Sequence, residues 1–284
     1  MITLMKRSLK LFFRDRMNMF FSLLGVVIII VLYMLFLGDV MRQSLPDMEG
    51  VRFMMDSWIM AGTLAVSTLT TTMGALGYAV YDRVNKIDRD FRVSPMPRRK
   101  IAGGYFLGAL GIGGIQCLVT LLFAEGYILL YGGKILPLPG MLKLLGVLAL
   151  SLLSSGGLAF FAVSFFRSAN AYGTASMLVG SMTGFLAGIY MPIGNLPGTV
   201  QWVVRLFPVA HSAALIRQIM MEAPMAVTFR GAPAEVVAAF NEELGVAFSF
   251  GGHVLPAWGG LLVLAGTAAV FFTLGFWNLT RKRK

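Results

Sequence analysis

Long apolar runs separated by short polar segments dominate this chain. A helix that crosses a bilayer needs about 20 mostly apolar residues, and six runs reach that length. They cover residues 19–38, 57–81, 103–131, 141–166, 171–191 and 255–277. Tyrosine and tryptophan residues lie near most of their ends, as expected for an aromatic belt at the membrane interfaces. The pattern predicts an all-α membrane protein with six transmembrane helices in a single domain over residues 1–284.

The segment before the first run has a different pattern. Between Ile2 and Met17 the apolar residues recur at helical spacing, and Lys6, Lys10 and Arg14 recur at i+4 on another face. A basic amphipathic helix lies in the plane of a membrane interface. Residues 1–18 therefore predict an interfacial helix in contact with lipid; the simpler alternative is a positively charged anchor. The first run has no small-residue cleavage site after it, so we interpret it as a span and not as a signal peptide.

The longest region outside the runs covers residues 192–254. Residues 202–221 are apolar enough to suggest a seventh span. This stretch also contains groups that are costly at bilayer depth, namely Arg205, Pro208, His211 and Arg217. We therefore expect outer re-entrant helices here, one or two short helices that dip into the outer leaflet. A further short amphipathic helix is expected over residues 232–245.

Composition excludes several classes of protein. Hydrophobic residues make up 57% of the chain and charged residues only 13%, with a mean hydropathy of +0.77. Soluble domains carry about 25% charged residues, so neither a soluble enzyme nor a disordered chain fits. The net charge of +11 would suggest a nucleic-acid partner in a soluble protein.

The placement of the charges explains this basicity differently. With six spans both termini share a side, and that side receives 17 of the 24 basic residues but four of the 13 acidic ones. The positive-inside rule then places both termini in the cytoplasm of a multi-pass protein of the plasma membrane. The charge bias and the even number of spans agree, which favours six spans over five or seven and makes a nucleic-acid partner unnecessary.

The chain lacks the sequence patterns of an enzyme. It has one cysteine and two histidines, and no nucleotide-binding, serine-hydrolase or metalloprotease motif. We therefore expect no catalytic residue, no metal site and no cofactor bound by this chain. The glycines at the start of the third run are interpreted as sites of close helix packing. Gly180, Gly184 and Gly188 form a small-residue ladder on the fifth run, interpreted as packing within or between subunits.

Two polar features lie inside the runs. Thr63, Ser67 and Thr70 form a hydroxyl-bearing stripe on the second run. This stripe predicts either helix packing, with hydroxyls bonded to backbone carbonyls, or the wall of a translocation pathway. Glu125 is an acidic residue within the third run, and an intramembrane ionisable group is a functional candidate. Alternatively, Glu125 reaches the outer interface; its candidate partners are Lys134, Lys143 and Arg205.

The loop between the second and third runs, residues 81–100, mixes both charge signs with Phe91 and two prolines. A loop that only sets the orientation of the chain in the membrane needs basic residues alone. This mixture therefore favours a structured element that docks onto a partner. Residues 82–91 can continue the preceding helix below the membrane, and Ser94-Pro95 predicts a turn.

Together these segments resemble the permease subunits of the ABC-2 family, which are ABC exporters with six spans per subunit. The loop that ends in Ser94-Pro95-Met96-Pro97-Arg98 is similar to that family's Ser-Pro-x-x-Arg segment between spans two and three. Tyr190 to Pro197 is similar to its Pro-x-x-x-Leu-Pro segment after span five. Residues 206–211 and the following Arg217 resemble the family's Asn-Pro stretch followed by an arginine, although Phe207 occupies the asparagine position.

The resemblance implies that the transport pathway and ATP binding belong to separate subunits. Two permease subunits, as a homodimer or heterodimer, would form the pathway, while separate ATP-binding subunits hold ATP and magnesium. A cytosolic coupling helix between spans two and three would touch the ATPase through Asp82, Lys86, Asp88, Asp90, Phe91 and Arg92. The cargo would be a hydrophobic or amphipathic drug, lipid, glycan or peptide, moved outward. The alternatives are an ion-coupled transporter or a membrane-embedded enzyme, which need intramembrane charges or a catalytic cluster that the chain does not clearly carry.

Overall fold

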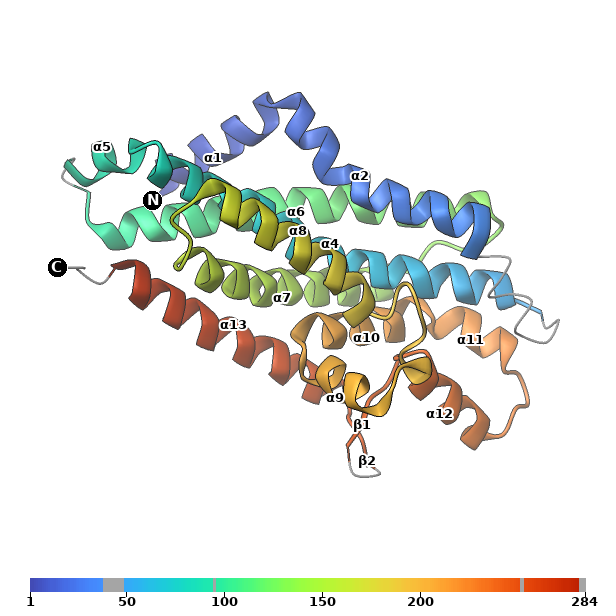
Figure 1. Ribbon diagram of the computed structural model, residues 1–284. Coiled ribbons are helices and arrows are strands. Elements are labelled where there is room, and N and C mark those ends of the chain that lie inside the picture. The colour runs from blue at the N-terminus through green and yellow to red at the C-terminus, as the bar shows by residue number, and fades with distance from the viewer. Residues whose placement is uncertain (38–48, 94–95, 251–252, 281–284) are drawn as a thin grey trace.

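The computed structural model describes residues 1–37, 49–93, 96–250 and 253–280 of the chain. Long helices run side by side in a bundle, and several short elements gather along one side of it (Figure 1). The longer helices are α1 (Ile2–Arg14), α2 (Arg16–Leu32), α4 (Val51–Val84), α6 (Arg98–Leu130), α7 (Leu138–Val163), α8 (Ala169–Leu186) and α13 (Ala257–Thr280). The short elements are the π-helical turn η1 (Tyr33–Leu37), α5 (Ile87–Val93), η2 (Ile193–Asn195), α9 (Gly198–Leu206), α10 (Pro208–Met220), α11 (Glu222–Thr228), α12 (Ala234–Glu243), β1 (Ser249–Phe250) and β2 (His253–Val254).

The predicted all-α membrane fold is confirmed, with one difference in the count of spans. Among the described residues, five helices are long and apolar enough to cross a membrane: Arg16–Leu35, α4, α6, α7 and α13. The predicted span 171–191 corresponds to α8, which has 18 residues and falls outside these five because asparagine, serine, threonine and glycine lower its hydropathy. Helices α9 and α10 pass the test only as a pair, and they are bent by 85°. Short helices are predicted over residues 202–221 and 232–245. Helices α9 and α10 occupy the first of these regions, and α12 occupies the second.

Helix α4 forms the centre of the bundle. Most of its residues are buried, because α6, α7, α8 and α10 pack around it. Helices α7 and α13 approach each other closely at small residues. A Cβ atom added to Gly157 would lie 3.1 Å from the carbonyl oxygen of Ala268, and one added to Gly275 would lie 3.0 Å from the Cα atom of Phe161. Such contact between backbones favours association of membrane helices, where dispersion and not the hydrophobic effect drives packing.

Helix α1 and the end of α13 lie at the same end of the bundle (Figure 1). The start of α1, helix α5 and the end of α13 lie together, while α9 to α12 and the β1–β2 hairpin lie toward the opposite half (Figure 1). Asp15 separates α1 from α2, and its side chain accepts a hydrogen bond from the backbone N–H of Asn18 at 3.0 Å, which caps α2.

Candidate functional site

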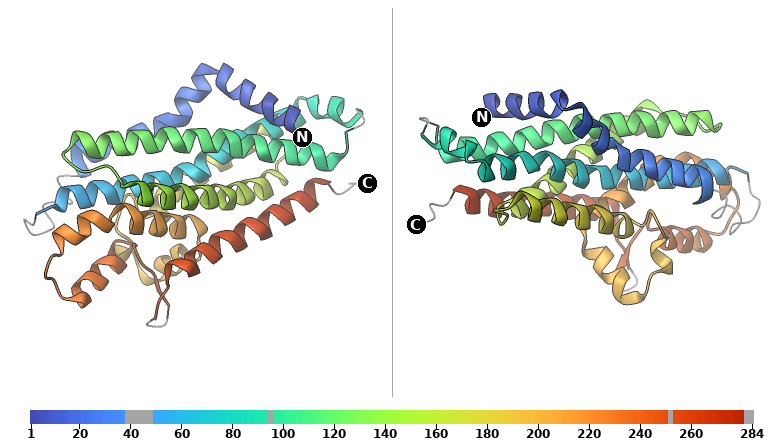
Figure 2. Two further views of the ribbon diagram at one scale, coloured as in Figure 1. Left: turned by 180° about the vertical axis from the view of Figure 1, so that it is seen from behind. Right: turned by 45° about the horizontal axis from the view of Figure 1, so that its top comes forward.

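Helix α1 lies along the start of α6 (Figure 2). The contact uses small residues: a Cβ atom added to Gly104 would lie 2.7 Å from the Cβ atom of Leu4, and one added to Gly108 would lie 2.8 Å from that of Ser8. The glycines that we interpreted as packing sites thus form a seat for α1. The predicted interfacial residues Lys6, Lys10 and Arg14 are exposed on the outer face of α1. Their contact with lipid stays a prediction.

An ion pair anchors α1 to the end of α4. Arg7 donates two hydrogen bonds to the carboxylate of Asp82, at 2.6 Å and 3.0 Å, and the hydroxyl of Tyr105 donates a third at 2.6 Å. The pKa of Arg7 is raised above its ordinary value, chiefly because its charged form is hydrogen-bonded to this carboxylate. Asp82 is only 1% exposed. The expectation that Asp82 touches a partner therefore needs correction, since its carboxylate is enclosed by α1 and α6.

The predicted helical continuation from Asp82 to Phe91 is interrupted. Helix α4 ends at Val84, and Lys86 adopts a φ of 63°, a left-handed conformation that a continuous helix cannot contain. Helix α5 then starts at Ile87 as a separate element. The cause is local backbone geometry, which the pattern of apolar and polar residues does not report.

Helix α5 presents two different faces. The centroid of the Phe91 ring lies 5.3 Å from the guanidinium of Arg7, and Phe91 is half-buried. Lys86, Asp90 and Val93 are exposed. The relative exposure of Val93 is 85%. Asp88 is half-buried and lines a pocket of about 70 Å³ together with Arg83 and Arg98. The side chain of Arg92 lies outside the described part of the chain.

Two further contacts connect the same end of the bundle. Arg83 donates a hydrogen bond to the carbonyl oxygen of Phe166 at 2.8 Å, just after α7. The side-chain amide of Asn278, near the end of α13, donates to the hydroxyl of Ser164 at 2.7 Å. Helices α1, α4, α5, α6, α7 and α13 are thus joined at this end, so a displacement of α5 reaches the bundle through side-chain contacts.

A cleft of about 600 Å³ lies between α2, α4 and α8. The predicted stripe of Thr63, Ser67 and Thr70 lines it, and so does Gly180 on α8. The hydroxyls of these three residues also donate hydrogen bonds to backbone carbonyls of their own helix, at 2.9, 2.7 and 3.1 Å. The hydroxyls are therefore bonded within their own helix, and the side chains of Thr63 and Ser67 are buried. Whether this cavity is the transport pathway stays a prediction.

Two of the three glycines of the predicted ladder, Gly180 and Gly184, lie on α8, and Gly188 follows its end. A Cβ atom added to Gly184 would lie 2.3 Å from the ring of Tyr190, a residue that folds back from the segment after α8. Gly188 lies beyond the end of α8 with a φ of 67°, and its N–H bonds to the carbonyl of Phe185 at 3.0 Å. Gly188 therefore ends the helix, a role that favours glycine because a left-handed residue has no Cβ penalty. Gly188 also lies at a close contact, since an added Cβ atom would lie 2.8 Å from Cγ1 of Ile193.

Arg217 of α10 is fully buried. Its guanidinium lies 4.6 Å from the ring centroid of Trp58 and donates to the carbonyl oxygens of Ala187 at 2.8 Å and Gly188 at 3.2 Å. A third, longer hydrogen bond of 3.4 Å reaches the carbonyl of Gly245. Arg217 thus joins α10 to α4, to the end of α8 and to the segment after α12.

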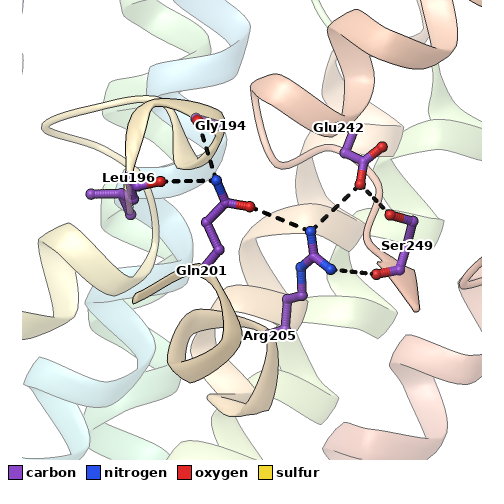
Figure 3. Close-up of polar contacts among 6 residues, drawn as sticks. All are labelled: Gly194, Leu196, Gln201, Arg205, Glu242 and Ser249. Atoms are coloured by element: carbon purple, nitrogen blue, oxygen red, sulfur yellow. Dashed lines mark hydrogen bonds and ion pairs between the residues drawn. The ribbon is translucent and has the colours of Figure 1, made fainter. Parts of the chain in front are cut away.

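The partners that we considered for Glu125 are not those seen in the structure. Glu125 is 8% exposed and accepts a hydrogen bond from the backbone N–H of Leu136 at 3.3 Å. Arg205, one of the candidates, instead pairs with Glu242 at 3.5 Å and donates to the carbonyl of Ser249 at 2.7 Å (Figure 3). This links α9 to α12 and β1. Glu125 therefore fastens the turn between α6 and α7, a short-range contact that composition alone does not predict.

Arg7 and Tyr105 were the residues that sequence reasoning missed at the α5 end. A signal was present for Arg7, because it departs from the i+4 row of Lys6, Lys10 and Arg14 and lies beside the buried residues Leu4 and Ser8. For Tyr105 the aromatic-belt interpretation concealed the hydrogen bond to Asp82. Among the described residues no group of three or more histidine, cysteine, aspartate or glutamate side chains is arranged to hold a metal ion.

Comparisons with known proteins identify a family. Residues 40–277 match the family described as "ABC-2 family transporter protein". The chain is also similar to Nodulation protein J of Rhizobium meliloti (strain 1021), with 27% identity over 216 residues. The aligned region covers 72% of this chain and 76% of that relative.

Proposed function

Since the chain belongs to the ABC-2 family of transporter proteins, we propose that it is the membrane-spanning permease of an ATP-driven exporter and works as a dimer. Membership of this family makes it an ABC transporter permease, a multi-pass transmembrane subunit that needs an ABC ATP-binding partner. Outward movement of cargo and the pairing with a second permease subunit are our proposals. In the proposed orientation both termini and α5 face the cytoplasm of a cell whose plasma membrane holds the protein.

One observation carries this proposal: a single continuous helix, α4, connects the α5 end with the cleft. Asp82, held by Arg7, lies at the end of α4, and Thr63, Ser67 and Thr70 lie on the same helix at the cleft wall. A partner can shift the access of a cleft only by binding two states of the protein with different affinity. A partner that grips α5 differently with and without ATP would displace α4 and with it one wall of the cleft.

The structure sharpens which residues of α5 would touch the ATPase. Asp90 and Val93 are exposed and Lys86 lies at the preceding turn, so these three are proposed as contacts. Phe91 and Asp82 are proposed to act indirectly. Both contact Arg7 of α1 and so stabilise the position of α5 and the end of α4. ATP and magnesium would be bound by the partner, and α9 and α10 would form the outer re-entrant segment. The cargo is proposed to be hydrophobic or amphipathic.

The test measures assembly and transport separately. The tagged chain is co-expressed with its ATPase, purified in nanodiscs, and compared with the variants Asp90→Arg and Glu235→Arg. Both variants reverse an exposed acidic charge, but Glu235 lies on α12, away from α5. We expect Asp90→Arg to reduce the retained ATPase at least about fivefold, since reversing a charge at an interface opposes association, and Glu235→Arg to leave it unchanged.

Transport is then followed in inverted vesicles with a fluorescent amphipathic dye. ATP-dependent accumulation inside these vesicles supports export, whereas accumulation that continues without ATP contradicts an ATP-driven permease. Equal retention of the ATPase by all three proteins would reject α5 as the docking element.

A further inference from the structure

A pocket of about 70 Å³ lies at the end of the bundle that holds the start of α1 and the end of α13 (Figure 1). Five helices contribute to its wall, namely α4, α5, α6, α7 and α13. Most of the wall is apolar and consists of Ala79, Ile101, Ala102, Phe160 and Leu279. Three charged side chains also line the pocket: Arg83, Asp88 and Arg98. The pocket therefore combines an apolar wall with a small group of charges.

The two arginines and the aspartate give the lining one excess positive charge. Arg83 is held in place, because its guanidinium donates a hydrogen bond to the carbonyl oxygen of Phe166 at 2.8 Å. Arg98 is exposed at the start of α6, and Asp88 of α5 is half-buried. A guanidinium suits phosphate, whose oxygens accept hydrogen bonds from its planar set of N–H groups. One excess positive charge is complementary to a phosphodiester, which carries a single negative charge.

Two exposed aromatic residues place the pocket at the depth of lipid head groups. Trp277 is 60% exposed and precedes Leu279 by two residues near the end of α13, and Tyr81 is 54% exposed and precedes Arg83 by two residues near the end of α4. Tryptophan and tyrosine concentrate at the membrane–water interface, which is also the layer of the head-group phosphates. The pocket has room for a few water-sized groups, so it admits a phosphate but not an acyl chain. Acyl chains would lie outside it, against the exposed side of α13, where Leu274 is 41% exposed.

We propose that this pocket binds the phosphodiester of an anionic phospholipid, a lipid with one net negative charge such as phosphatidylglycerol. Arg83 and Arg98 contact the phosphate oxygens, and Asp88 limits the positive charge that the phosphate meets. A basic pocket between helices, at the level of the head groups, is the kind of site that recognises such lipids. Phosphatidylcholine is a poorer ligand, because its choline cation would be repelled by the same arginines. The bound lipid would connect α5 with the end of the last transmembrane helix.

The fluorescence of Trp277 reports which lipid lies beside the pocket. The full-length chain is reconstituted without its ATPase in nanodiscs of phosphatidylcholine and phosphatidylglycerol, with the acyl chains of one lipid brominated at a time. Bromine quenches tryptophan on contact, so the two labelling schemes give the preference between the lipids. The signal of Trp277→Phe, which retains Trp58, Trp202 and Trp258, is subtracted. We expect phosphatidylglycerol to be preferred about fivefold, the factor that one basic charge near a membrane surface contributes.

Two substitutions in the pocket should shift this preference in opposite directions. Arg98→Gln removes a positive charge and should reduce the preference to about twofold or less, whereas Asp88→Asn removes the negative charge and should raise it about fivefold further. Arg99→Gln and Asp90→Asn are the matched controls, since both residues are exposed, lie on the same two helices and do not line the described pocket. Each control should change the preference by less than about twofold, as expected for an exposed charge outside a site.

Three results would overturn the proposal. The first is equal quenching by the two lipids in the unaltered protein, a comparison that does not depend on the folding of any variant. The second is a control that shifts the preference as much as its partner in the pocket, because this result indicates only a diffuse attraction to the surface. The third is loss of the preference in excess dimethyl phosphate, a phosphodiester without acyl chains, which would assign the pocket to a soluble ester. The measurement involves no ATP, so it is independent of the proposed transport function.

Discussion

Arg7 and Asp82, 75 positions apart in the chain, form an ion pair closed by two hydrogen bonds of 2.6 and 3.0 Å. The pair joins the amphipathic N-terminal helix to the most buried helix of the bundle, and Tyr105 adds a third bond to the same carboxylate. This arrangement makes α1 part of the structure that surrounds α5. It also gives α1 a mechanical role that a surface anchor would not have.

Loss of Arg7 should destabilise the protein. Arg7→Ala leaves the carboxylate of Asp82 buried without its cationic partner, and we expect the free energy of unfolding to fall by about 2 kcal/mol. This is less than the about 3–5 kcal/mol of fully buried pairs, because the Arg7 side chain is 29% exposed and partly screened. Unfolding in mixed micelles measures the change. Lys10→Ala, an exposed residue of the same helix, should have little effect; an equal loss in both variants would contradict the role of the pair.

The seat of α1 can be tested by chemical labelling. In a Cys117→Ala background, a cysteine at Leu4 should be protected from a membrane-impermeant maleimide, since Leu4 is 3% exposed. Gly108→Val should raise its labelling rate at least about tenfold, because a Cβ atom there would lie 2.8 Å from the Cβ atom of Ser8 and displace α1. Gly114→Val is the control on α6, where the nearest atom is 3.6 Å away. Protection that persists in Gly108→Val would show that α1 does not depend on this seat.

Arg217 should be intolerant even of lysine. Lysine keeps the charge but lacks the planar fork that reaches Ala187, Gly188 and Gly245 while lying against Trp58. We expect Arg217→Lys to lower the free energy of unfolding by about 2–4 kcal/mol, as for other buried charges that lose their partners. Arg230→Lys, at an exposed arginine of the same outer region, is the matched control and should change it by less than about 0.5 kcal/mol. A tolerated Arg217→Lys would contradict the network.

Two glycine substitutions should act in opposite directions. Gly245 has a φ of 63°, and an added Cβ atom would lie 2.4 Å from Ile193, so Gly245→Ala should destabilise by about 1–3 kcal/mol. Gly146 lies inside α7 with no other atom within 4 Å of an added Cβ, so Gly146→Ala should be neutral or stabilise by up to about 1 kcal/mol. Thermal unfolding in detergent compares the two. Destabilisation by Gly146→Ala would indicate a contact with another subunit at that face.

Several site assignments followed from the sequence because they depend on neighbouring residues. The exposure of Lys6, Lys10 and Arg14 follows from spacing along one helix. The placement of Thr63, Ser67 and Thr70 on one side of α4 follows in the same way, since a stripe at helical spacing faces one direction. Asp82 was misassigned because its surroundings depend on partners elsewhere in the fold. Asp82 is enclosed by Arg7 and Tyr105, and Gly188 is required by the left-handed end of α8.

What the sequence determined by itself is the membrane class and the arrangement of helices along the chain. Insertion into a bilayer depends on sums over local stretches, namely apolar length and the placement of Lys and Arg, and both can be read from one sequence. Only the tertiary structure decided which polar groups meet. The contacts of Arg7 with Asp82 and of Arg217 with Trp58 each combine side chains from separate helices. Their positions depend on packing, because close contact of small residues sets the distance between helices and leaves no local trace in the sequence. The position of α5 depends on the break at Lys86.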